Sequence, residues 1–276
     1  MIERIPVTSA RSLPEAYSVL ADRPRGLRVL AGGTDLMVAV NARAGLERIG
    51  HVLDIWKLPE LRGIHRDGGM LRIGALTTYT GLIHSPLVLE ALPALAQVSR
   101  EVGAVAIQNR GTLGGNVCNA SPAGDTLPIL LAAEARFVLG GPRGERSLAA
   151  REFFTGYRKT ALGADELLLR VDVPIAGRLV YRKVGTRRAQ SIAKTIVAAR
   201  ALPGLREVRI GAGCLAPIPL RCPNAEAAAE ARAPEAELRA ALDRDIAPID
   251  DVRSTADYRR RVTGNVLLQL LRQLET

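Results

Sequence analysis

The most informative segment of the chain reads QNRGTLGGNVCNASPAGD and covers residues 108–125. Three glycines, Gly111, Gly114 and Gly115, stand there among small polar residues, and glycine lets backbone N–H groups approach a ligand closely. The apolar run over 126–133 predicts a helix with Asp125 as its cap and a proline in its first turn. A glycine-rich loop that leads into a helix N-terminus suits an anionic ligand such as a pyrophosphate.

Another loop of this kind lies upstream at residues 31–35 and reads AGGTD; we call it the first loop and residues 108–125 the second loop. It follows a strand-like run over 27–30 and precedes a predicted helix over 36–40, capped by Thr34 or Asp35. Two such loops could hold one dinucleotide from two sides. Neither has the Gly-x-Gly-x-x-Gly or the Gly-x-x-x-x-Gly-Lys-Ser/Thr pattern, and a Gly-Gly pair alone also fits a tight turn.

Composition narrows the class of protein. The 276 residues can form one large domain or two modest ones, and 47% of them are hydrophobic. No apolar run is long enough to span a membrane, and no signal peptide is visible, so we expect a cytoplasmic chain. The net charge is +10, but only four basic residues are lysines and aromatic residues make up 3%. This composition argues against nucleic-acid binding and favours an anionic cofactor or acidic partner subunits.

The sequence offers no metal site and no catalytic residue of its own. Cys118, Cys214 and Cys222 lack Cys-x-x-Cys spacing, and the three histidines lie far apart, so we expect neither a disulfide scaffold nor a metal site. Cys118 lies within the second loop, where a small buried filler is favoured over a redox role. Ser121 is in the same loop but has no Gly-x-Ser-x-Gly context.

The predicted elements give an α+β fold. A first unit, about 1–60, has strands at 2–6, 27–31 and 51–54 and a helix that a capping box starts at Ser12. A second unit, about 61–174, has a strand at 70–74, helices near 79–84 and 87–102, and a hairpin of 135–139 with 145–148. Residues 175–276 predict strands at 179–184, 192–202 and 208–214, followed by helices over 225–232, 234–242 and 255–274.

Six segments together resemble a known family: 31–36, 73–77, 108–125, 166–174, 181–189 and 257–259. They are similar to the FAD-binding medium subunits of molybdenum hydroxylases, which include xanthine dehydrogenase and aerobic carbon monoxide dehydrogenase. The resemblance covers nearly the whole chain. It implies a two-part FAD-binding domain of the PCMH type over 1–174, then a C-terminal domain over 175–276 with a three-stranded antiparallel sheet and a helix bundle.

From the residues themselves, we expect backbone N–H groups over 31–34 and around 112–116 to face the pyrophosphate, while Asp125 binds the cofactor or only caps its helix. The resemblance adds that 29–36 lines the phosphate and ribityl parts, and that Lys183 approaches FAD, although a solvated lysine at a strand end is the simpler alternative. The resulting FAD-binding set is Val29, Leu30, Ala31, Gly32, Gly33, Thr34, Asp35, Leu36, Thr112, Leu113, Gly114, Gly115, Asn116, Asn119, Asp125, Leu168 and Lys183.

The resemblance implies noncovalent FAD in this chain, with molybdopterin and [2Fe–2S] clusters only in partner subunits. The expected partners are a small [2Fe–2S] subunit and a large molybdopterin subunit, in a heterotrimer or its dimer. Residues 187–192 lack the acidic or aromatic groups of the relatives, so reaction with NAD is not implied. Two alternatives stay open: a self-sufficient flavin oxidoreductase of the same fold, and a basic nucleic-acid-binding protein whose glycine loops are only turns.

Overall fold

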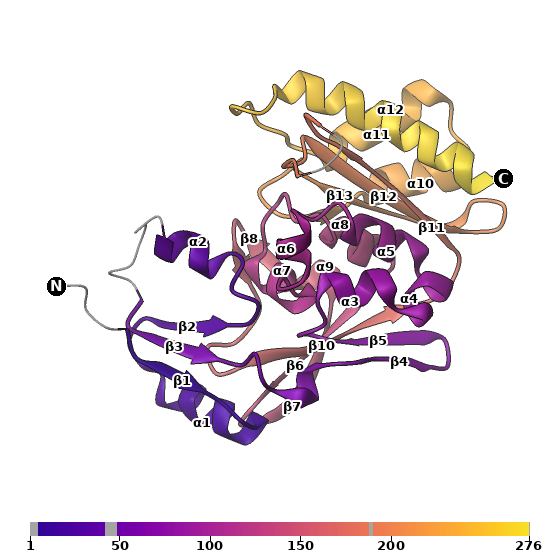
Figure 1. The fold of residues 1–276 in the computed structure, drawn as a ribbon. Helices are drawn as coiled ribbons and strands as arrows, with labels where there is room; N and C mark the ends of the chain where they lie inside the picture. The colour runs from indigo at the N-terminus through magenta and orange to yellow at the C-terminus, as the bar shows by residue number, and fades with distance from the viewer. Residues whose placement is uncertain (1–4, 42–48, 188–189, 276) are drawn as a thin grey trace.

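The computed structural model describes residues 5–41, 49–187 and 190–275. It confirms the α+β class: a small sheet near the N-terminus, a central sheet covered by helices, and a C-terminal sheet under a layer of helices (Figure 1). Within these residues, no helix is both long and apolar enough to cross a membrane.

The N-terminal sheet is parallel, with strand order β1-β3-β2. Its strands are β1 (Val7–Ser9), β2 (Leu27–Leu30) and β3 (His51–Asp54), and its helices are α1 (Leu13–Asp22) and α2 (Leu36–Asn41). The predicted cap forms, because the Ser12 hydroxyl accepts the Glu15 N–H and the Glu15 carboxylate accepts the Arg11 N–H. Of the predicted strand over 2–6, residues 2–4 lie outside the described residues, and the observed strand begins at Val7.

The central sheet is antiparallel, with strand order β4-β5-β10-β6-β7. Its strands are β4 (Ile64–Asp67), β5 (Met70–Gly74), β6 (Arg136–Gly141), β7 (Gly144–Ala149) and β10 (Leu167–Pro174). A separate hairpin consists of β8 (Phe154–Gly156) and β9 (Lys159–Thr160). A short 3-10 helix over Pro59–Leu61 precedes β4, and the other helices of this region are α3 (Tyr79–His84), α4 (Pro86–Ala91), α5 (Pro93–Ser99), α6 (Val105–Gln108), α7 (Leu113–Asn119), α8 (Leu127–Ala132) and α9 (Ala150–Phe153).

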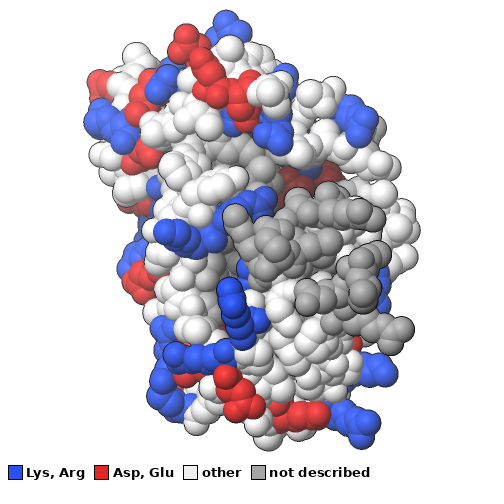
Figure 2. Space-filling model, turned by 90° about the vertical axis from the view of Figure 1, so that its left-hand side faces the viewer, with Lys and Arg blue, Asp and Glu red and all other residues white. Residues whose placement is uncertain are grey.

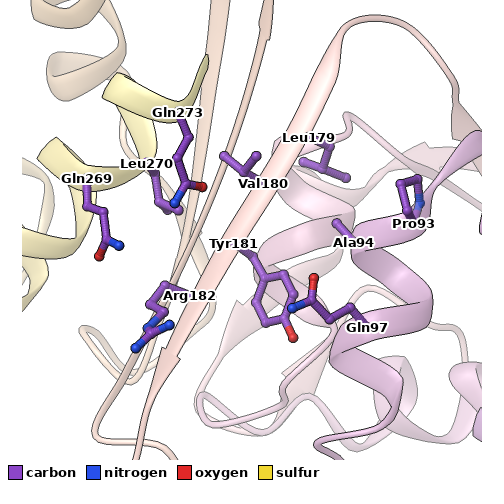
Figure 3. Close-up of a pocket in the computed structure, with 10 residues that line it drawn as sticks. All are labelled: Pro93, Ala94, Gln97, Leu179, Val180, Tyr181, Arg182, Gln269, Leu270 and Gln273. Carbon is purple, nitrogen blue, oxygen red and sulfur yellow. The ribbon is translucent and has the colours of Figure 1, made fainter. Parts of the chain in front are cut away.

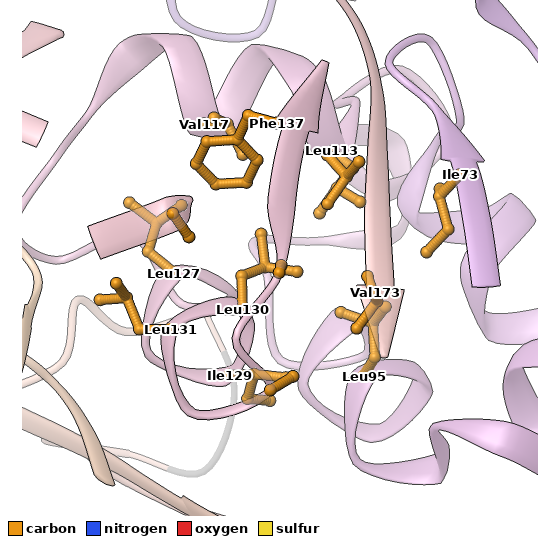
Figure 4. Close-up of a cluster of buried hydrophobic side chains, with 14 of the residues drawn as sticks. Ile73, Leu95, Leu113, Val117, Leu127, Ile129, Leu130, Leu131, Phe137 and Val173 are labelled. Atoms are coloured by element: carbon orange, nitrogen blue, oxygen red, sulfur yellow. The ribbon is translucent and has the colours of Figure 1, made fainter. Parts of the chain in front are cut away.

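The main core lies between this sheet and its helices. Figure 4 shows apolar side chains of α7 and α8 gathered beside β6 and β10. Phe137 is fully buried, and its ring meets that of Phe153 edge to face, with centroids 4.9 Å apart. This packing fixes α7, which carries polar residues of the second loop, and the apolar helix α8 against the sheet.

The C-terminal sheet is antiparallel, with strand order β11-β12-β13-β14. It comprises β11 (Arg178–Val184), β12 (Thr195–Leu202), β13 (Arg206–Gly213) and the two-residue β14 (Leu220–Arg221), which the sequence did not predict. Helices α10 (Pro223–Glu230), α11 (Glu235–Asp245) and α12 (Ala256–Glu275) cover it. On α12, the predicted apolar face is buried at Val266, Leu270 and Leu274.

Two predicted elements were wrong. The single helix over 87–102 is two helices, α4 and α5, because Pro93 cannot continue the hydrogen-bond ladder of the first. The segment over 108–125 is not one continuous loop, because it contains the helix α7, which starts at the Thr112 cap. Gly114 and Gly115 therefore lie in the first turn of a helix, whereas Gly111 precedes the Thr112 cap and residues 120–126 form the predicted connection to α8.

Candidate functional site

The two glycine loops meet in space. A Cβ atom built on Gly32 would lie 1.7 Å from the carbonyl oxygen of Arg110, so only glycine permits this approach. Across the same contact, the Arg110 side chain donates from Nε to the Gly32 carbonyl oxygen at 3.4 Å. The structure thus brings together two segments that are far apart in the sequence, as the two-loop interpretation predicted.

The first loop follows β2 at the carboxyl end of the parallel sheet, where ligands of open α/β sheets bind. Gly33 has φ +80°, a left-handed conformation that glycine adopts without strain. Among the described residues, the N–H groups of Gly32, Gly33 and Thr34 donate no hydrogen bond to the chain. Three consecutive free backbone donors can bind an anion.

The second loop is different. The N–H groups of Leu113–Asn116 all donate within the chain: two to the carbonyls of Ala75 and Thr77, and two to Thr112. The sequence argument expected these donors to face a ligand, and the structure shows them already used. The second loop therefore supplies shape and side chains, while free backbone donors come from the first loop.

Side chains also link the loops. Asn119, the last residue of α7, donates from Nδ2 to Asp35 Oδ1 at 2.9 Å. Its Oδ1 accepts a hydrogen bond of 2.7 Å from Nη1 of Arg158, which lies in the β8–β9 hairpin. Asp35 and Asn119 were both predicted as site residues, whereas Arg158 was not, and no spacing in the sequence could have placed it there.

The single tryptophan of the chain lies beside this contact. Trp56 follows β3, and the guanidinium groups of Arg110 and Arg62 lie 3.8 Å and 4.5 Å from its ring centroid. Neither arginine forms an ion pair with a carboxylate of the described residues. Their charges therefore add to the positive potential near the free N–H groups of the first loop.

Asp125 and Lys183 form a buried ion pair, with Asp125 Oδ2 and Lys183 Nζ 2.8 Å apart and side chains only 12% and 6% exposed. Lys183 Nζ also donates to the Glu101 carbonyl at 3.2 Å. Burial raises the pKa of Asp125 to about 6, although Lys183 opposes the shift. Asp125 Oδ1 is buried without a hydrogen-bond partner, so it can still accept one from a ligand.

The simpler alternatives for these two residues are wrong. Asp125 does not cap α8, because Thr126 occupies the cap position and no side chain bonds there. Lys183 is not a solvated lysine at a strand end.

A cavity of about 640 Å³ adjoins this pair, and Lys183, Glu101, Tyr181 and Arg187 are among its lining residues. The Tyr181 hydroxyl donates to Glu101 Oε1 at 2.8 Å. A smaller cavity of about 250 Å³, also lined by Tyr181, lies between α5, β11 and α12 (Figure 3). Tyr181 and Lys183 project to the same side of β11, since they are two residues apart on a strand. That spacing was the one sequence signal that could have added Tyr181 to the site.

For Leu168, Cys118 and the 187–192 stretch, the structure differs from the sequence prediction or describes only part of the segment. Leu168 is 4% exposed and belongs to the main core, so its side chain lies inside the domain. Cys118 is exposed on α7, which corrects its interpretation as a buried filler. Of the 187–192 stretch, residues 188–189 lie outside the described part of the chain.

On the face shown in Figure 2, the Lys and Arg side chains form separate groups with white and red residues between them.

Comparisons with known proteins agree with this geometry. Residues 3–176 match the family described as the FAD binding domain in molybdopterin dehydrogenase, and residues 180–274 match the CO dehydrogenase flavoprotein C-terminal domain. The chain is 32% identical to the carbon monoxide dehydrogenase medium chain of Hydrogenophaga pseudoflava, over 95% of this chain and 93% of that one. It is 33% identical to the xanthine dehydrogenase FAD-binding subunit of Escherichia coli O157:H7, over 91% and 89%.

Solved structures show the same likeness. A structure of carbon monoxide dehydrogenase from Hydrogenophaga pseudoflava, which lacks the Mo-pyranopterin moiety of its molybdenum cofactor, matches with a TM-score of 0.90 at 32% identity, over 98% of this chain and 96% of that one. Quinoline 2-oxidoreductase from Pseudomonas putida 86 matches with a TM-score of 0.87 at 25% identity, over the full length of both. The resemblance and the FAD cofactor are confirmed: the chain belongs to the family of FAD-binding medium subunits of molybdenum hydroxylases, and it is a subunit of an oxidoreductase.

Proposed function

We propose that this chain holds noncovalent FAD between its two glycine loops and passes electrons from [2Fe–2S] clusters of a small partner subunit to a terminal acceptor. The large partner would carry the molybdopterin and the substrate. The observation that carries this proposal is the contact of the loops at Gly32, with three free N–H groups beside it. The medium-chain names of the relatives support a multi-subunit assembly.

The residues present fit the chemical parts of FAD. The N–H groups of Gly32–Thr34 suit the pyrophosphate, and the Asp35 carboxylate suits a sugar hydroxyl. Asp125 Oδ1, buried and unpaired, suits a polar N–H or O–H of the cofactor. The proposed binding set remains Val29–Leu36, Thr112–Asn116, Asn119, Asp125, Leu168 and Lys183, with Leu168 contributing through its backbone.

When bound, FAD supplies one-electron and two-electron chemistry that no side chain of this protein can supply. The chain's own residues bind and orient it. Lys183 keeps a positive charge at the wall of the 640 Å³ cavity, and its bonds to Asp125 and the Glu101 carbonyl hold that charge in one place. An ammonium group at this wall would stabilise negative charge on a bound cofactor, offset in part by the paired Asp125 carboxylate.

We also propose a functional division of the chain at Pro174, where β10 ends before β11 begins at Arg178. Residues 1–174 would bind the nucleotide and phosphate parts of FAD with subdomains over about 1–60 and 61–174. Residues 175–276 would contribute Lys183. The separate ranges of the two family matches support this division.

The relay is tested by purifying the tagged full-length chain from its own cells and measuring bound metals and flavin. We expect co-purified iron and molybdenum in a ratio of about four to one, because each of two [2Fe–2S] clusters holds two irons. Acid precipitation should release all the FAD, since it is noncovalent. Flavin without iron or molybdenum, together with substrate turnover by the chain alone, would instead support a self-sufficient oxidoreductase.

A further inference from the structure

Arg158 has a backbone conformation that its residue type disfavours. It lies between β8 and β9, where Gly156 pairs with Lys159, and its φ is +51°. Glycine adopts this left-handed region without strain, whereas a side chain adds a steric cost. Residues held in such conformations often serve a site, because the surrounding structure must compensate for the strain. The side chain of Arg158 is therefore the feature to explain.

The Arg158 side chain reaches out of its hairpin to the end of α7. Its Nη1 donates to Asn119 Oδ1 at 2.7 Å, and the next residue, Ala120, ends the helix in the left-handed region at φ 48°. α7 has no basic residue in its own last turn, so Arg158 supplies a cation there from another element. Among the described residues it forms no ion pair with a carboxylate, and apart from the ring of its neighbour Tyr157, with its centroid 6.0 Å away, its charge meets this amide.

We propose that Arg158 is a positioning residue for the cofactor site, acting through the amide of Asn119. This inference rests on the proposed function. An amide can turn so that its oxygen and nitrogen exchange places, and its hydrogen-bond partners decide which orientation it takes. Arg158 can only donate, so it holds the amide oxygen toward itself. The amide nitrogen must then face Asp35, to which it donates at 2.9 Å.

The fixed amide has two consequences for a dinucleotide. Asp35 Oδ1 is occupied by Asn119, which leaves Asp35 Oδ2 to accept a hydrogen bond from a sugar hydroxyl. The same bond ties the first loop to the end of α7, so the free N–H groups of Gly32–Thr34 keep their place. Without Arg158 the amide oxygen loses its anchor, so the Asn119 side chain can leave Asp35 for another rotamer and the tie between the first loop and α7 is lost.

The test is Arg158→Gly in the full-length chain, with FAD affinity and thermal stability measured on the same samples. Glycine relieves the backbone strain, so the apo protein should melt at or above the wild-type temperature. The FAD dissociation constant should nevertheless rise about tenfold, because a charge-assisted hydrogen bond in the site is lost. Arg158→Lys keeps a charged donor and should stay within about threefold of wild type.

The matched control is Arg232→Gly, since Arg232 is also exposed with φ +52° but lies at the end of α10. It should not change FAD affinity. In an Asn119→Ala background, Arg158→Gly should add no further loss of affinity, because its effect passes through that amide. An FAD dissociation constant of Arg158→Gly within twofold of wild type would overturn the proposal. A further loss of about tenfold in FAD affinity when Arg158→Gly is added to Asn119→Ala would overturn it as well. A wild-type chain that binds no FAD would instead refute the proposed function.

Discussion

Replacing Gly32 with alanine is expected to abolish FAD binding, with no saturation up to about a hundred times the wild-type dissociation constant. The added Cβ would lie 1.7 Å from the carbonyl oxygen of Arg110 and 2.6 Å from its carbonyl carbon. Both neighbours are backbone atoms, so neither can move aside as a flexible side chain would. The two loops must separate, and the free N–H groups of Gly32–Thr34 then lose their position. Equilibrium titration with FAD measures the effect.

The matched control is Gly69→Ala, because Gly69 lies in a turn between β4 and β5 and a Cβ there meets no atom within 4 Å. That variant should bind FAD as the wild type does. Gly32→Ala should keep most of its thermal stability, since Gly32 lies outside the hydrophobic core. A Gly32→Ala protein that retains full FAD affinity would show that the contact of the loops has no role in binding.

Replacing Lys183 with methionine is expected to lower the free energy of unfolding by about 3 kcal/mol at pH 8, because it leaves a buried carboxylate without its cation. The loss should be smaller at pH 5. The pKa of Asp125 is already raised to about 6 by burial, and removal of Lys183 raises it further. At pH 5 the native state of the variant can bind a proton on Asp125 and avoid the buried charge. At pH 8 the free energy of protonating Asp125 is higher, so the native state is destabilised more. Urea denaturation at the two pH values measures the difference.

Two further variants separate this effect from a general loss of packing. Lys57 is exposed, so Lys57→Met should leave stability unchanged at both pH values. The double variant Lys183→Met with Asp125→Asn should recover at least half of the loss at pH 8, because it removes the uncompensated charge. An equal loss for Lys183→Met at pH 5 and pH 8 would contradict the assignment of the buried pair.

Local patterns were enough to predict much of the fold. The capping box at Ser12 and the hairpin of β6 and β7 were found from short segments, because the residues that form them are neighbours in sequence. The same local reasoning failed at Pro93, which splits one apolar helical pattern in two. It also failed at Gly114, because the glycines there let α7 start close to β5 and do not mark an irregular loop.

The candidate site could be predicted only in part, for a different reason. Its two glycine loops and Asp125 have local sequence signals, and the resemblance added Lys183. The contacts of Arg158 with Asn119 and of Trp56 with Arg110 join segments 39 or more residues apart and depend on how the elements pack. No periodicity or spacing encodes such contacts, so they emerge only once the sheets and helices are in place.

The central claim is that the two glycine loops form one FAD site, and the fluorescence of Trp56 tests it most directly. Trp56 is the only tryptophan of the chain, and it lies against Arg110, whose carbonyl contacts Gly32. Titration of the full-length apo chain with FAD should quench this emission and saturate at one FAD per chain. A chain that stays colourless, with tryptophan emission unchanged by FAD, would contradict the account.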